Sequence, residues 1–242
     1  MDSAIIVIPA DENEAEEGVV GAEPSAAVIR TTDSLLRSGG DVVDVAAGHR
    51  LELELDNMVV SAGGSLVHAH GLPRGVTSEP IRISLTQVTA RTAGGLVQLE
   101  SAGGEPELPI ADVRVRDSIL ATTSKGAPLF RVDGQDSLSA LRDRIKWEGH
   151  GVAYHQINAY RRDQSAQVGS VPTIYDRSSW VVAIGTKEAD PFHGDVKFLQ
   201  DWDPERTAWT LNRDDVRLAR DSPSPRAGAD LDTIPNVAPS EP

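Results

Sequence analysis

The sequence predicts an all-β solenoid, a single-stranded parallel β-helix, with one short helix after residue 134. Three observations predict this fold. Four segments between residues 29 and 134 share one pattern, and apolar and polar residues alternate within each, which is typical of half-buried strands. The polar positions of successive segments are only 24 to 30 residues apart. A unit of that size buries its apolar side by stacking on the next unit.

Each repeat unit has an alternating strand, a polar residue, a glycine-containing turn and a second alternating strand. The polar residues are Asp33, Asn57, Gln87 and Asp117. The turn glycines are Gly39-Gly40, Gly63-Gly64, Gly94-Gly95 and Gly126, and the second strands are entered by Val43, Val67, Val97 and Phe130. A β-sandwich is the alternative fold, but it favours hairpin turns such as Asn-Gly, and none occurs in the sequence.

The unit resembles a coil of the right-handed parallel β-helix in the pectate-lyase-like superfamily. Its polar residues resemble the column of stacked Asn and Asp side chains at one bend of such coils. The stretch VRLARDSPSPRAGADLD at residues 216–232 resembles the close of exported bacterial β-helix proteins, with Ser224-Pro225 where that family prefers Ala-Ile. Residues 128–163 are similar to β-helix regions of planctomycete-type proteins, some associated with Ser/Thr kinases. The resemblance implies an extracytoplasmic location; the sequence alone leaves the compartment open.

Outside the four units, the elements are expected in the following order. Residues 1–26 form an N-terminal cap, with a strand over Ala4 to Ile8 and then an acidic loop, and the β-helix occupies residues 27–215. Helical spacing of Leu138, Leu141 and Ile145 predicts a short helix over residues 137–146. Strands are expected over residues 152–160, 173–175 and 180–184. The tail at residues 216–242 is expected to be extended and partly mobile, with Trp202 and Trp209 pinning the C-terminal segment onto the last unit.

Composition excludes several classes of partner and chemistry. The net charge of −14 disfavours binding to nucleic acid or to an anionic membrane. The chain has no cysteine, so disulfides and thiol chemistry are excluded. No apolar run approaches the roughly 18 residues of a membrane span, and the N-terminal AIIVIP is too short for a signal peptide.

The stretch SLVHAHG raises the question of a metal site, because His68 and His70 alternate on one strand. Alignment of the units makes the positions between the apolar columns point outward, which places one polar patch on a sheet face. Its members are Asp44, His68, His70, Gln98, Glu100, Arg131 and Asp133. The patch could hold a divalent cation or an oligosaccharide, but favourable cross-strand polar pairs on a solvated face are the simpler interpretation. No metal site is predicted, because two histidines from one strand do not supply three or four ligands; Ca²⁺ is possible but not specified.

The predicted function is a non-catalytic structural or recognition module that binds a polysaccharide or a protein. One alternative, implied by the resemblance, is a polysaccharide lyase or glycoside hydrolase. Another is an accessory or sensor region of a larger signalling protein. No catalytic residue is identified, because carboxylates opposite the outward Arg114, Arg116 and Arg131 are expected to be missing. His150, Tyr154 and His155, near Trp147 and Tyr160, are expected to fill the end of the regular stack rather than form a sugar-stacking platform.

Overall fold

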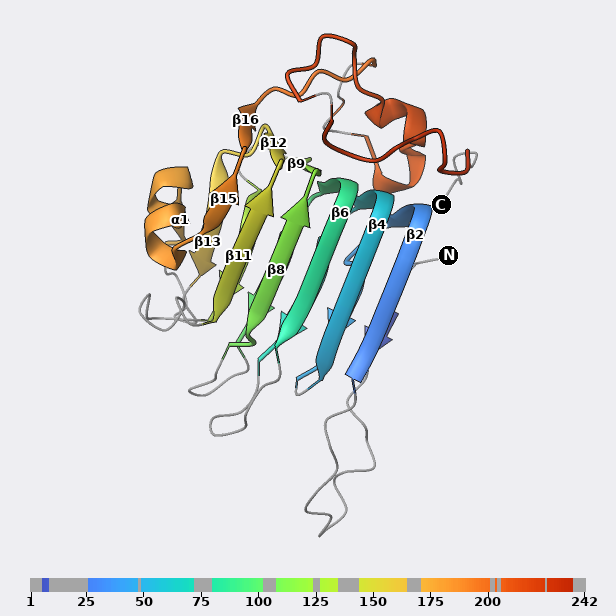
Figure 1. Ribbon diagram of the computed structural model, residues 1–242. Helices are drawn as coiled ribbons and strands as arrows, with labels where there is room; N and C mark the ends of the chain where they lie inside the picture. Colours follow the sequence, from blue (N-terminus) through green and yellow to red (C-terminus); the bar gives the residue numbers. More distant parts are fainter. Residues whose placement is uncertain are drawn as a thin grey trace.

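Parallel strands dominate the computed structural model (Figure 1). It describes residues 6–8, 26–47, 49–71, 80–101, 108–123, 127–134, 144–164, 171–200, 203, 206–224 and 226–236. Among these residues, a seven-stranded sheet has the order β1-β3-β5-β7-β10-β13-β14 and a nine-stranded sheet the order β15-β11-β8-β6-β9-β12-β16, with β2 and β4 added beside β6. The fold is therefore mostly β, with a curled parallel sheet.

The nine-stranded sheet bends along one line of residues. Three long strands run through the bend: β2 (Ala26–Ser38), β4 (Arg50–Ala62) and β6 (Ile81–Thr92). Before the bend, the first arm continues with β8 (Ala111–Arg116), β11 (Ile145–His150) and β15 (Lys187–Ala189). After it, the second arm continues with β9 (Ile119–Thr122), β12 (Ala153–His155) and β16 (Phe192–Gly194).

The bend itself is a column of residues with left-handed backbone. The four polar residues of the repeat occupy it with positive φ, and the register continues the column through Gly151 and Asp190; the φ values are Asp33 47°, Asn57 51°, Gln87 52°, Asp117 46°, Gly151 63° and Asp190 52°. Asn57 Nδ2 donates to Asp33 Oδ1 at 2.6 Å. Asn and Asp tolerate this conformation better than most residues, which explains why the repeat places polar residues there.

The seven-stranded sheet faces the two arms across the core. It contains β1 (Ile6–Ile8), β3 (Val43–Val45), β5 (Ser65–His70), β7 (Gly95–Glu100), β10 (Pro128–Asp133) and β13 (Ala159–Gln164), all parallel, and the antiparallel β14 (Thr173–Tyr175). The predicted inward columns are confirmed: Val43, Val67, Val97 and Phe130 lie in register, as do Val45, Ala69, Leu99 and Val132. All eight are buried.

One expected element is wrong, and so is the end of another. Ile145 and Lys146, the end of the expected helix, begin strand β11, whose side chains alternate between buried and exposed; residues 135–143 lie outside the described residues. Conversely, residues 180–184 are not a strand. They belong to helix α1 (Arg177–Ile184), which Asp176 caps by accepting from Ser179 N at 2.9 Å and Gly185 ends with φ of 63°.

Helix α1 lies at the edge of the sheets, where it contacts β13, β11 and β14 (Figure 1). Trp180 and Ile184, four residues apart on one helix face, are its buried residues. The Trp180 ring lies 4.9 Å from that of Phe130. A strand would also turn Val182 towards the core, because alternate residues of a strand share one face, whereas in the helix Val182 is 70% exposed.

The C-terminal segment, residues 195–236, packs across the outer side of the second arm (Figure 1). It contains two short 3₁₀ helices, Ala208–Thr210 and Arg213–Val216. Leu211, Val216, Leu231 and Ile234 cover Val59 of β4, and Ala227 covers Ile119 of β9. The sequence suggests a partly mobile tail, but the described residues of this segment are packed against the sheet.

Polar bonds also attach the C-terminal segment. Arg37 Nε donates to Leu211 O at 2.7 Å, and Arg91 Nη2 donates to Asp203 O at 3.1 Å. Trp209 lies over Gly39, at the turn after β2. It therefore contacts the first described unit rather than the last one, and Trp202 lies outside the described residues.

The described part of the expected N-terminal strand is β1, Ile6–Ile8, which pairs with β3, and Ala4 and Ile5 lie outside the described residues. The acidic loop after it lies outside the described residues. In the part of the chain that the structure describes, no helix is long and apolar enough to cross a membrane.

Candidate functional sites

The register brings the seven predicted site residues onto the outward side of the seven-stranded sheet. Its pairs form one column of Asp44, His68, Gln98 and Arg131, and a second of His70, Glu100 and Asp133. The residues between them in each strand are the buried ones listed above, so these side chains project away from the core. The arrangement expected from the repeat is present, and we call it the histidine face.

The two histidines of this face each contact two carboxylates. His68 Nδ1 lies 3.2 Å from Asp41 Oδ2, and His68 Nε2 lies 3.1 Å from Glu100 Oε2. His70 Nε2 lies 2.9 Å from Asp44 Oδ1, and His70 Nδ1 lies 3.5 Å from the same Glu100 Oε2. The ring centroids are 4.3 Å apart. Both rings therefore converge on one oxygen, and each is held from its other side by an aspartate.

Asp41 is the member of this face that sequence reasoning missed. It lies in the turn before β3, where its Oδ1 accepts from Ser65 N at 2.5 Å. The same oxygen occupies the space that a Cβ at Gly64 would need. The sequence signal is the aspartate that ends the Gly39-Gly40-Asp41 turn. Small residues follow at the neighbouring positions of the next units, Ser65 and its register partner Gly95, and they leave room for the Asp41 side chain.

Electrostatics couple Asp41 and His68. The hydrogen bond with Asp41 raises the pKa of His68 above its ordinary value, against the opposing effect of burial, and Glu100 adds to the increase. The bond to His68 likewise lowers the pKa of Asp41, with smaller contributions from the Ser65 amide and the charge of Arg131. Hydrogen bonds to an ionised form favour that form, so each member stabilises the charge of the other.

The remaining members of the histidine face form a separate group around Asp133. Arg131 Nε lies 2.8 Å from Asp133 Oδ2, and Gln98 Nε2 donates to the same oxygen at 3.1 Å. The contact agrees with the alignment of the units, which places Arg131 and Asp133 on the same outward face. Asp133 is two residues along the same strand, and period-two alternation places both side chains on one side.

Among the described residues, Asp44, His68 and His70 make one group with metal-binding geometry. One ligand atom from each lies within 4.8 Å of the other two, and all three side chains are half-buried. Two imidazole nitrogens and a carboxylate oxygen form a donor set that suits zinc and similar transition metals. The histidine face thus brings together ligands from two strands, which the sequence alone did not specify.

A second candidate site is a groove along the outer side of the first arm. It consists of two cavities of about 750 and 400 Å³ that share Ser84 and Arg114. The larger also reaches Arg116, Glu148 and His150, and the smaller reaches Glu52, Glu54, Arg82 and Asp112. Because the lining residues come from β4, β6, β8, β11 and β15, the groove crosses several strands.

Arg114 lies between two carboxylates in this groove. Its Nε is 3.7 Å from Asp112 Oδ1 and 3.8 Å from Glu148 Oε2, and Glu148 is its direct neighbour in the register. The expected lack of carboxylates around Arg114 is therefore wrong, because the distant unit that begins with β11 supplies Glu148. The side chains of Arg114 and Glu148 are 67% and 62% exposed, so water screens their interaction.

The aromatic residues near the end of the stack are internal. Trp147, Tyr154 and Tyr160 are buried. Glu188 accepts from Trp147 Nε1 at 3.2 Å and from the Tyr154 hydroxyl, and burial raises the pKa of Tyr154. Rings enclosed in this way cannot stack on a sugar, so they fill the end of the core. His150 alone among the residues considered for a platform is exposed, and it lines the groove.

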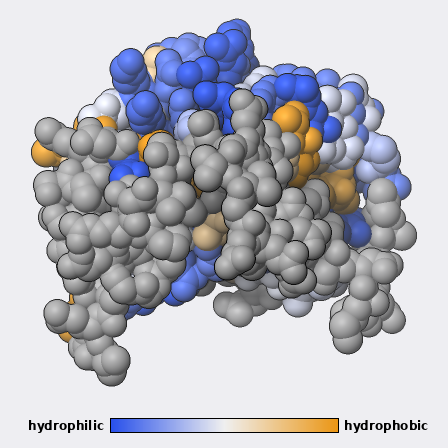
Figure 2. All heavy atoms as spheres, turned by 90° about the horizontal axis from the view of Figure 1, so that it is seen from below, coloured by the Kyte–Doolittle hydropathy of each residue, from blue (hydrophilic) through white to orange (hydrophobic). Residues whose placement is uncertain are grey.

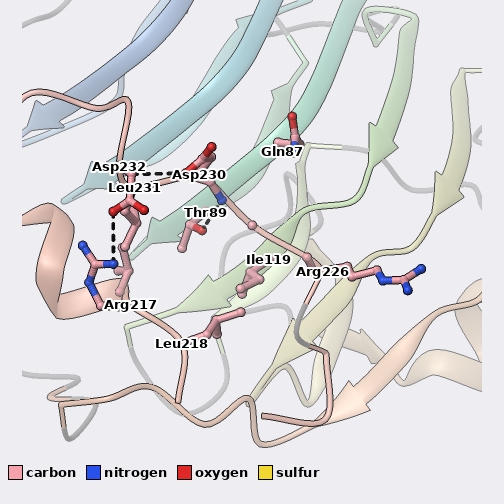
Figure 3. A pocket seen from close by; sticks show the side chains of 13 residues that line it. Gln87, Thr89, Ile119, Arg217, Leu218, Arg226, Asp230, Leu231 and Asp232 are labelled. Atoms are coloured by element: carbon pink, nitrogen blue, oxygen red, sulfur yellow. Dashed lines mark hydrogen bonds and ion pairs between the residues drawn. The ribbon is translucent and has the colours of Figure 1, made fainter. Parts of the chain in front are cut away.

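A third cavity, of about 360 Å³, lies between the second arm and the C-terminal segment (Figure 3). Thr89 and Ile119 line it from the sheet, and Leu218, Asp230 and Asp232 line it from the segment. Two contacts within the protein involve its polar groups: Thr89 Oγ1 accepts from Ala229 N at 3.1 Å, and Arg217 Nη1 lies 3.4 Å from Asp232 Oδ1. This cavity is part of the packing of the segment.

Comparison of the chain with protein-family models, curated proteins and solved structures found no match. Function is therefore argued from the two surface sites.

Proposed function

We propose that the chain is a right-handed parallel β-helix that serves as a non-catalytic recognition module and binds a polysaccharide along the groove of the first arm. The stacked register, repeated through six positions of the bend, supports the solenoid. Parallel strand connections are right-handed in nearly all proteins, which supports the handedness.

The observation that carries the proposed function is the continuity of the groove. Two cavities joined through Ser84 and Arg114 run across successive strands, and an extended site of this kind suits a polymer better than a compact ligand. Its lining alternates arginine and lysine with glutamate and aspartate. Such groups can bind the hydroxyl and carboxylate groups of a polysaccharide through charge-assisted hydrogen bonds.

Several features favour a polysaccharide over a protein partner. Few large apolar side chains are exposed in the described residues: Val28, Val171, Ile174, Val182 and Leu199. In Figure 2, which views the molecule from below, the described surface is mostly hydrophilic and its hydrophobic residues form only small groups. A stable protein interface usually has an apolar centre, whereas a sugar-binding groove can be largely polar.

The exposure of the charged groups in the groove supports binding rather than catalysis. A general acid or base works best when burial or a neighbour tunes its pKa towards the working pH. Arg114 and Glu148 are mostly exposed and lie against each other. This arrangement positions charges for a ligand but does not isolate one for proton transfer.

The second candidate function is a polysaccharide lyase or hydrolase acting in the same groove. The observation that favours it is the convergence of Arg114 with Asp112 and Glu148, because such enzymes combine carboxylates with a group that moves a proton. The two functions differ in whether the bound polymer is cleaved.

The test is a glycan array that includes neutral and anionic polysaccharides, followed by affinity measurements and an assay for unsaturated and reducing-end products with and without Ca²⁺. We expect binding without products. Arg114→Ala should weaken binding by about 10-fold, the equivalent of one charge-assisted hydrogen bond. Lys197→Ala is the matched control, because Lys197 is exposed and pairs with Asp221 in the C-terminal segment.

Each outcome decides between the alternatives. Products from the wild type that disappear in Arg114→Ala would establish the enzyme instead. Absence of binding to every glycan, or equal binding by Arg114→Ala and the wild type, would overturn the proposed groove.

A further inference from the structure

The histidine face carries an inference that does not depend on the function of the groove, because it lies on the other sheet. Two histidines of β5, an aspartate of β3 and a glutamate of β7 point to the same outward area. We propose that Asp44, His68 and His70 bind a divalent transition-metal ion of the zinc class.

The spacing of the donor atoms suits a small tetrahedral ion. With metal–ligand bonds of about 2.0–2.1 Å, the donors of a tetrahedral site lie about 3.3 Å apart. His70 Nε2 and Asp44 Oδ1 are 2.9 Å apart. The widest separation among Asp44, His68 and His70 is at most 4.8 Å, so rotation of half-exposed side chains suffices to close the site.

The strands hold the ligands in place before any ion arrives. His68 and His70 are two residues apart on β5, which puts both on the same side of the sheet. Parallel pairing then fixes Asp44 beside His68 and Glu100 beside His70. Sites built on regular elements lose less entropy on binding than sites built on loops.

Asp41 has the position of an orienting group. Metal-bound histidines usually donate their second ring N–H to a carboxylate, which fixes the ring and its tautomer. Asp41 Oδ2 lies 3.2 Å from His68 Nδ1 and leaves His68 Nε2 for the metal. The bond from Ser65 N at 2.5 Å anchors Asp41 in turn. Asp41 is therefore a positioning residue rather than a ligand.

The charge of the face favours a cation. Three carboxylates, of Asp41, Asp44 and Glu100, surround two histidines. Arg131, on the same face, is engaged by Asp133 at 2.8 Å. Two imidazole nitrogens select against Ca²⁺ and Mg²⁺, which prefer oxygen ligands, and favour Zn²⁺, Ni²⁺, Cu²⁺ or Co²⁺.

The direct test is titration of the tag-free full chain with ZnCl₂ by calorimetry, with metal content measured after dialysis. We expect one Zn²⁺ per chain. His68→Ala and His70→Ala should each weaken binding by about 100-fold or more, and Asp41→Asn by about 10- to 100-fold, the usual cost of losing an orienting group. His150→Ala is the control, because this exposed histidine lies 3.9 Å from an aspartate, Asp117, on the other sheet.

Cobalt and thermal shifts separate a built site from surface binding. Co²⁺ should give the visible absorption bands of tetrahedral coordination in the wild type and lose them in Asp44→Asn. Zn²⁺ should raise the unfolding midpoint of the wild type and of His150→Ala only. His70→Asn, at the more exposed of the two histidines, serves as a second variant if His68→Ala fails to fold.

Two results would overturn the proposal. One is Zn²⁺ affinity that is the same in the wild type and in folded His70 variants. The other is the absence of any stoichiometric binding at millimolar Zn²⁺.

Discussion

At the scale of single residues, the surroundings of two histidines shift their pKa values in opposite directions. His68 faces outward against Asp41, and the hydrogen bond between them raises the pKa of His68. His155 is buried, and its Nδ1 accepts from Val196 N at 3.0 Å. Burial lowers the pKa of His155 to about 4, and the charge of Asp195 opposes this with a smaller effect. Burial disfavours the charged imidazolium, so this imidazole is held neutral.

This difference predicts that His155 makes stability depend on pH. The ordinary pKa of histidine is about 6.5, so the unfolded chain takes up the proton first as the pH falls. The contribution of His155 to stability is complete above about pH 6.5 and is lost progressively down to about pH 4. We expect the free energy of unfolding to fall by about 1–2 kcal/mol between about pH 7.5 and pH 5 from this group.

Urea unfolding of the wild type and of His155→Asn at both pH values measures this effect. The asparagine Oδ1 can still accept from Val196 N, so the variant keeps the hydrogen bond and loses the titration. Other groups contribute equally to both proteins. Equal pH dependence in the two would show that His155 is not responsible.

At the scale of elements, the bend of the nine-stranded sheet depends on residues that adopt positive φ. Asn57, with φ of 51°, also binds three neighbours. Its side chain donates to Asp33 Oδ1 and Thr233 Oγ1 and accepts from Asp230 N at 2.6 Å. Asn57 therefore links two turns of the bend to the C-terminal segment.

Substitution at this position separates backbone strain from hydrogen bonding. Asn57→Gly and Asn57→Ala both lose the three bonds, at a cost of about 1–3 kcal/mol or more. Alanine adds about 1–2 kcal/mol, because a Cβ disfavours the left-handed backbone. Gln87→Gly and Gln87→Ala form the matched pair, since exposed Gln87 has the same φ. In thermal and urea unfolding, the free energy of unfolding should differ between the glycine and alanine variants by a similar amount at both positions. The total loss relative to the wild type should be larger at Asn57.

The element scale also shows where local patterns mislead. Helical spacing of Leu138, Leu141 and Ile145 suggested a helix, but Ile145 and Trp147 face the core from a strand that pairs with β8. In α1 the expectation was a strand and the structure has a helix. The run WVVAI is typical of strands, but Asp176 and Gly185 cap a helix over these residues. Pairing and packing outweigh propensities of a few tenths of a kcal/mol per residue.

At the scale of the whole molecule, the C-terminal segment closes the outer side of the second arm. The cluster of Val59, Leu211, Val216, Leu231 and Ile234 joins residues far apart in sequence. The Arg213 guanidinium donates to Ile234 O, and Thr233 Oγ1 donates to Asp33 Oδ1 at 3.1 Å. The C-terminal segment thus shields the outward apolar residues of the second arm from water. The outward residues of the first arm are largely charged or polar and remain at least partly exposed.

This arrangement predicts that the segment is part of the cooperative fold. Ile234→Ala should lower the free energy of unfolding by about 2–4 kcal/mol, because Ile234 is 1% exposed and its loss leaves a cavity. Leu199→Ala, at a residue that is 67% exposed, should change it by less than about 0.5 kcal/mol. Urea unfolding measures both. If Ile234→Ala only speeds proteolysis of the segment and leaves the unfolding midpoint unchanged, the segment is an independent appendage.

Local sequence patterns were sufficient to predict the stacked units, the inward columns, the polar residues of the bend and the placement of the seven residues of the histidine face. This was possible because alternation with period two and a fixed repeat are local properties, and they set which side chains face outward in every unit. The tertiary structure decided the rest. Asp41 reaches His68 from a turn, Glu148 reaches Arg114 from a unit 34 residues away, and the C-terminal segment returns to Asp33 across 200 residues. Such contacts depend on the free energy of packing between distant segments, which no local pattern encodes.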